Sequence, residues 1–137
     1  MTQKYLNDLT HTIIGAAIDV HKELGPGLLE SIYEKCLAYL LREEGLNIVS
    51  QQRVPLIFKG LNLDCDLRFD LLVEDSIIVE IKAVDCLIPI HQAQLLTYMK
   101  LLEKPKGILF NFNCTNIFKE GQKTMVNEIY AKLPKGY

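Results

Sequence analysis

The feature that most constrains the fold is a change of hydrophobic period after Gly45. Before this residue, apolar side chains recur every three or four positions, which is the spacing of one helix face. After it, apolar and polar residues alternate, and successive side chains of a strand point to opposite faces. The sequence therefore predicts helices at the start of the chain and a β-sheet after them.

Two helices are expected before Gly45. The first begins at Leu6 and ends at Gly25, because Gly25-Pro26-Gly27 combines residues that readily adopt positive φ with one that does not continue a helix. The second covers Leu28–Glu44 and ends before Gly45, a residue type that is common just beyond helix ends.

Three strands are expected next. They cover Ile48–Phe58, Leu61–Leu71 and Ile77–Ala83, with turns at Lys59-Gly60 and at Glu74-Asp75-Ser76. In the last of these strands the apolar residues share one face, and the charged residues Glu80 and Lys82 share the other.

The remaining segments predict a third helix over Gln92–Leu102 with Pro89 in its first turn, a buried strand over Ile108–Asn113, a short strand near Ile117-Phe118 and a last helix over Thr124–Leu133. This order of elements predicts a mixed sheet flanked by helices. We expect one domain over residues 1–137.

Composition indicates the compartment. The chain is 49% hydrophobic and 23% charged, as in a globular domain, and has no basic-then-apolar signal region or long apolar run. Its four cysteines lie 29, 21 and 28 residues apart, which argues against a zinc site or a disulfide framework. A reducing cytoplasm, with no membrane association, is the expected location.

Charge is unevenly distributed along the chain. The net charge is only −2, but residues 1–98 hold 8 Lys and Arg against 14 Asp and Glu, whereas residues 99–137 hold 7 against 3. A phosphate-binding rim is one interpretation of four lysines in the second part, and solvated surface lysines are the other. These residues are Lys104, Lys106, Lys119 and Lys123.

Two acidic residues are expected to face each other across the second hairpin. If Glu74–Ser76 form a three-residue loop, Val73 pairs with Ile77 and Asp70 falls opposite Glu80. Like charges in this position destabilise a hairpin, so a divalent cation between them would explain the arrangement. A two-residue turn would shift the register by one, and an ordinary solvated strand face also fits the spacing.

Several motifs in one order resemble the PD-(D/E)XK nucleases. Asp70, then Val79-Glu80-Ile81-Lys82, then Gln94-Leu-Leu-Thr-Tyr98 is similar to their RecB-like branch with its QxxxY helix. Gly27-Leu-Leu-Glu30-Ser-Ile-Tyr33 resembles the signature of the prokaryotic GxxExxY proteins in that superfamily, over most of residues 5–125. The sequence departs from the family name at Phe69, which stands where a proline is expected.

The resemblance implies a restriction-endonuclease-like core of the α/β (α+β-like) class, with a central mixed sheet of four to five strands. It implies metal-dependent hydrolysis of phosphodiester bonds in DNA or RNA, DNA ahead of RNA, with Mg²⁺ or alternatively Mn²⁺. By the same resemblance, Asp70, Glu80 and the carbonyl of Ile81 would be metal ligands, Lys82 the base, Glu30 an additional acid, and Gln94 and Tyr98 the lining of the phosphate path.

Other interpretations stay open from the sequence alone. Tyr98 and Glu30 also suit purely structural roles, and His21 on a helix stripe is interpreted as structural and left out of the catalytic set. A catalytically silent nuclease-fold module that binds nucleic acid or a protein is one alternative function, and a hydrolase of small phosphate esters is another. Because so small a domain has little surface for a duplex, we expect a homodimer or a larger protein partner.

Overall fold

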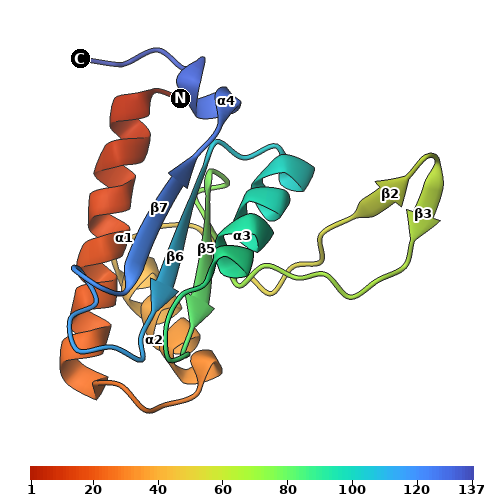
Figure 1. Ribbon diagram of the computed structural model, residues 1–137. Coiled ribbons are helices and arrows are strands. Elements are labelled where there is room, and N and C mark those ends of the chain that lie inside the picture. The colour runs from red at the N-terminus through yellow and green to blue at the C-terminus, as the bar shows by residue number, and fades with distance from the viewer.

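A five-stranded mixed sheet forms the centre of the protein, which is described by a computed structural model over residues 1–137. The strand order is β1-β4-β5-β6-β7, in which only β5 and β6 run parallel (Figure 1). The strands are β1 (Ile48–Ser50), β4 (Leu71–Val73), β5 (Ile77–Lys82), β6 (Lys106–Asn111) and β7 (Gln122–Val126). The predicted mixed sheet is confirmed.

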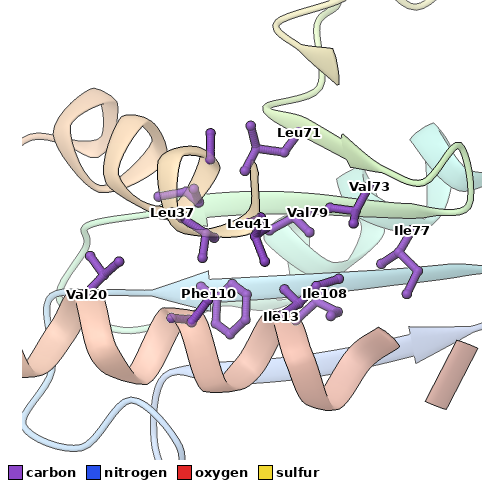
Figure 2. Close-up of a cluster of buried hydrophobic side chains, with 14 of the residues drawn as sticks. Ile13, Val20, Leu37, Leu41, Leu71, Val73, Ile77, Val79, Ile108 and Phe110 are labelled. Carbon is purple, nitrogen blue, oxygen red and sulfur yellow. The ribbon is translucent and has the colours of Figure 1, made fainter. Parts of the chain in front are cut away.

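Helices cover both faces of this sheet. They are α1 (Gln3–Leu24), α2 (Glu30–Glu43) and α3 (Pro89–Leu102), and the short α4 (Glu128–Ala131) follows β7. The larger apolar cluster joins α1 and α2 to one face, where Ile13 and Leu37 pack towards Val79 and Phe110 (Figure 2). The smaller cluster joins α3 to the opposite face. None of the helices combines the length and hydropathy required to cross a bilayer.

The helix boundaries follow the signals in the sequence. Helix α1 ends where expected, with Gly25 at φ 65°, and α3 begins at Pro89. Helix α2 is shorter than predicted, because Leu28 and Leu29 remain outside it.

The first two predicted strands are wrong as continuous elements. Each is divided, and their outer parts form a separate two-stranded sheet, β2 (Leu56–Phe58) with β3 (Leu61–Leu63). This hairpin projects away from the body (Figure 1). The division begins at Gln51, whose φ of 53° interrupts the extended backbone directly after β1.

Two predictions near the C-terminus also need correction. No strand forms at Ile117-Phe118, and Ile117 is instead buried in a turn. The predicted helix over Thr124–Leu133 is wrong in its first part, because residues 122–126 pair with β6 as strand β7. Only α4 is helical, and the Asn127 side chain caps it by accepting hydrogen bonds from two amides.

Tyr33, the tyrosine of the Gly27–Tyr33 motif, stabilises the turn between α1 and α2 through side-chain hydrogen bonds. Tyr33 is fully buried and stacks on Phe112 at 4.5 Å between ring centroids. Its hydroxyl donates to the Gly25 carbonyl at 2.6 Å and accepts from the Leu28 amide at 3.1 Å. This tyrosine is therefore part of the structural core of the motif.

Replacing Tyr33 with Phe is expected to lower the free energy of unfolding by about 1–2 kcal/mol, because two backbone groups lose their partner. Urea denaturation measures the change. The matched control is Tyr137→Phe, at a fully exposed tyrosine, for which we expect a change within about 0.5 kcal/mol. Equal stability of the two variants would contradict the assigned role.

Candidate active site

The acidic residues meet at the end of β5 because of the hairpin that precedes it. Val73 pairs with Ile77 and Leu71 with Val79, so the three-residue loop and its register are confirmed. Glu74 and Asp75 in this loop both have φ of 51°. Asp70, directly before β4, therefore lies across from Glu80.

Asp70 and Glu80 are joined by a pair of crossed hydrogen bonds. The amide of Asp70 donates to Glu80 Oε1 at 2.9 Å, and the amide of Ile81 donates to Asp70 Oδ2 at 2.7 Å. Glu80 is only 5% exposed, whereas Asp70 is half-buried. The backbone thus holds both carboxyl groups at one place on the face of the sheet that α3 covers.

No counter-charge neutralises this pair. Burial raises the pKa of Glu80 to about 8, and the charge of Asp70 acts in the same direction. The Asp70 amide and the Lys82 ammonium lower this pKa, but by less. Neither carboxyl forms an ion pair within 4.0 Å. Glu80 therefore holds a proton at neutral pH when no cation is bound.

A third carboxyl group joins the site from α2. Gln51 Nε2 donates to Glu34 Oε1 at 2.5 Å and to Asp70 Oδ1 at 3.1 Å. Burial raises the pKa of Glu34 to about 7, and the neighbouring Asp70 contributes in the same direction. Sequence reasoning missed Glu34, although its position four residues after Glu30 places both on one helix face.

Glu30 reaches the same end of β5 but contacts the backbone. Its Oε2 accepts a hydrogen bond from the Ala83 amide at 3.0 Å, and its side chain is exposed. The Gln51 side-chain amide, which donates to Asp70, donates to Glu34 and not to Glu30.

Gln94 and Tyr98 lie together on α3, as their spacing predicts. Gln94 Nε2 donates to the Tyr98 hydroxyl at 3.2 Å. Tyr98 is buried, and burial together with the charge of Glu80 raises its pKa. The phenol therefore lies within electrostatic reach of the acidic pair, and Gln94 beside it is exposed to solvent.

Asn111 fixes the backbone that follows Lys82. It is 3% exposed, accepts from the Val84 amide at 3.0 Å and donates to the Val84 carbonyl at 2.9 Å. Lys82 itself pairs with Asn111 across the parallel strands and forms no ion pair within 4.0 Å. Sequence reasoning missed this residue, because a single buried asparagine has no distinctive pattern.

The four lysines do not line one rim, so this interpretation of them does not hold. Lys106 is 4% exposed and bonds Asn7 at 2.8 Å, while Lys104 pairs with Asp75 at 2.8 Å. Only Lys119 and Lys123 line a shared surface cavity, beside the loop that follows β5. His21 Nε2 lies 2.8 Å from the Cys114 carbonyl oxygen, as a structural histidine would.

A comparison with family models identifies the architecture around this site. The model described as the PD-(D/E)XK nuclease superfamily matches residues 7–125, a span that contains all the acidic residues above. The chain belongs to the PD-(D/E)XK nuclease superfamily. Neither a curated protein nor a solved structure matches it. For a PD-(D/E)XK chain, the five-stranded mixed sheet flanked by helices is the restriction-endonuclease-like fold.

PD-(D/E)XK nucleases typically use divalent metal ions, and the donors at the end of β5 are of the matching kind. Carboxylate and carbonyl oxygens are the ligands that Mg²⁺ and Mn²⁺ prefer. Asp70 and Glu80 supply two carboxyl groups without a neutralising partner. The structure has no group of three or more His, Cys, Asp or Glu side chains placed to hold a metal ion. A cation here would therefore need backbone oxygen and water as further ligands.

Proposed function

We propose that this PD-(D/E)XK chain is a nuclease that hydrolyses phosphodiester bonds with a divalent cation held by Asp70, Glu80 and the carbonyl of Ile81. The observation that carries the proposal is the buried Glu80 carboxyl, which the backbone holds beside Asp70 without a counter-charge. Ionising the buried Glu80 beside Asp70 is costly, and a bound cation offsets that cost. Mg²⁺ is the first candidate and Mn²⁺ the second.

The residues around the pair have distinct roles in this proposal. A bound cation would act as a Lewis acid on a phosphoryl oxygen and would lower the pKa of water. The Lys82 ammonium, free of ion pairs, orients the attacking water and offsets the charge that develops on the phosphate. Glu34 and Glu30 complete the acidic side, while Gln94 and Tyr98 line the phosphate path from α3.

The position of the site outside the surface cavities favours a polymer as substrate. Five surface cavities of the protein are lined by residues other than Asp70, Glu80 and Lys82. A site that binds a small phosphate ester is normally a concave pocket that covers most of its ligand. We therefore propose nucleic acid, DNA ahead of RNA, in a cytoplasmic protein of the GxxExxY group within the RecB-like branch.

Replacing Lys82 with Ala is expected to lower the rate of cleavage by about 100-fold or more, because the ammonium acts on the transition state. The assay incubates the protein with labelled DNA and RNA in Mg²⁺, Mn²⁺ or EDTA. Lys100→Ala, at an exposed position on α3, is the matched control and should retain the wild-type rate. Cleavage that persists in EDTA or in Lys82→Ala would contradict the proposed mechanism.

A second candidate function is a catalytically silent nuclease-fold module that binds a partner. The projecting β2–β3 hairpin favours it, because Ile57, Phe58 and Leu61 on this hairpin are each at least 60% exposed. This alternative predicts nucleic-acid or protein binding without Mg²⁺-dependent cleavage in the same assay.

A further inference from the structure

The β2–β3 hairpin, residues 56–63, is an arm with one apolar face. Its register pairs Leu56 with Leu63 and Phe58 with Leu61, so these four side chains share a face. Phe58 and Leu61 are each 60% exposed. An isolated two-stranded hairpin is marginally stable in water at best. The apolar face of the arm therefore needs a surface to pack against.

The charges of the arm disfavour nucleic acid as that surface. Arg53 lies 3.4 Å from Asp64, and Arg68 lies 2.6 Å from Asp66, so the arginines at its base are already paired. Among the cations of the arm and its base, Lys59 at the tip is the one without an acidic partner. Affinity for a polyanion depends on several free cations, so a protein surface is the better match.

A suitable groove lies between α1 and α2 of this same chain. It encloses about 440 Å³, and its walls are mainly apolar. The apolar lining residues are Val20, Leu24, Cys36, Tyr39 and Leu40. The charged lining residues are the exposed Asp19, Glu23 and Lys35, so acidic groups outnumber basic ones, and Asp19 and Glu23 on α1 complement the charge of Lys59.

The groove is out of reach of the arm of the same molecule. Figure 1 shows the arm extending from the side of the sheet opposite α1, which forms one wall of the groove. An arm that occupies the groove must therefore come from another molecule.

We propose that the arm of one copy of this chain packs into the α1–α2 groove of a second copy, and that the arm of the second copy packs into the same groove of the first. Phe58 and Leu61 enter the apolar groove, and Lys59 lies against Asp19 and Glu23. Reciprocal exchange closes the assembly as a two-fold dimer in which each molecule gives an arm and receives one. The proposal does not rest on nuclease activity.

Light scattering coupled to size-exclusion chromatography, over a wide range of protein concentration, tests the exchange. We expect wild type to be a dimer and Phe58→Ser to raise its dissociation constant at least about tenfold, the equivalent of about 1.4 kcal/mol. Phe118→Ser, at a 57% exposed phenylalanine outside the arm and the groove, should leave the dimer intact. All these positions are exposed, so the variants are expected to fold.

Charge reversal separates this contact from a general loss of apolar surface. Lys59→Glu and Glu23→Lys should each weaken the dimer, and the double variant should recover most of the affinity. A strictly monomeric wild type, or a dimer unaffected by Phe58→Ser, would overturn the proposal. Loss of nucleic-acid binding in Phe58→Ser with unchanged mass would also overturn it and make the arm a nucleic-acid contact.

Discussion

Phosphodiester cleavage is expected to fall at least about 1,000-fold when Glu80 is replaced with Gln. The amide has nearly the shape of the carboxyl group, so it can keep the contact with the Asp70 amide. It carries no charge, however, and is a poor ligand for a hard cation. The variant therefore removes a charged cation ligand from the site with little change in the packing around it.

Single-turnover rates on labelled DNA with Mg²⁺ in excess measure this effect. The matched control is Glu43→Gln, at an exposed position in α2 away from the site, which should cleave at the wild-type rate. A Glu80→Gln rate within tenfold of wild type would remove Glu80 from the mechanism.

The same substitution is expected to stabilise the cation-free protein at high pH. Glu80 has an ordinary pKa of 4.5 when unfolded and about 8 when folded. Between these values the folded protein binds more protons than the unfolded chain, so the free energy of unfolding decreases as pH rises. At about 1.36 kcal/mol per pKa unit, the loss from Glu80 amounts to at most about 5 kcal/mol above pH 8. Because a glutamine side chain does not ionise, Glu80→Gln does not undergo this loss of stability.

Urea denaturation in EDTA at pH 5 and pH 9 tests this expectation. Wild type should lose more stability between the two values than Glu80→Gln, and Mg²⁺ at pH 9 should restore wild type alone. Glu34 also has a raised pKa, which destabilises both proteins in the same direction, so the comparison isolates Glu80. If wild type and Glu80→Gln lose the same free energy of unfolding between pH 5 and pH 9, the pKa of Glu80 is not raised in the folded protein.

The parts of the fold that follow local signals were predictable from the sequence. Gly25 and Pro89 mark helix ends through their backbone preferences, and these boundaries are confirmed. The loop at residues 74–76 determined the hairpin register, and therefore the position of Asp70 opposite Glu80. Local geometry was enough to bring these two carboxyl groups together.

The features that depend on tertiary contacts were not predictable in the same way. Alternation in residues 48–71 indicates an apolar strand face but not the partner of that face, so the pattern predicts two long strands rather than a separate arm. Strand β7 contains polar residues and forms because it pairs with the edge of β6. Gln51 joins Glu34 to Asp70, and the positive φ of Gln51 that allows this has no signal in the sequence.

Titration of the protein with Mn²⁺ in a calorimeter at pH 7 tests most directly whether Asp70 and Glu80 form a cation site. Wild type should bind Mn²⁺ with release of protons, because Glu80 is protonated until the cation arrives. Glu80→Gln should bind at least about tenfold more weakly and release fewer protons. Equal affinity in the two proteins, or no binding to wild type, would contradict the assignment of this site.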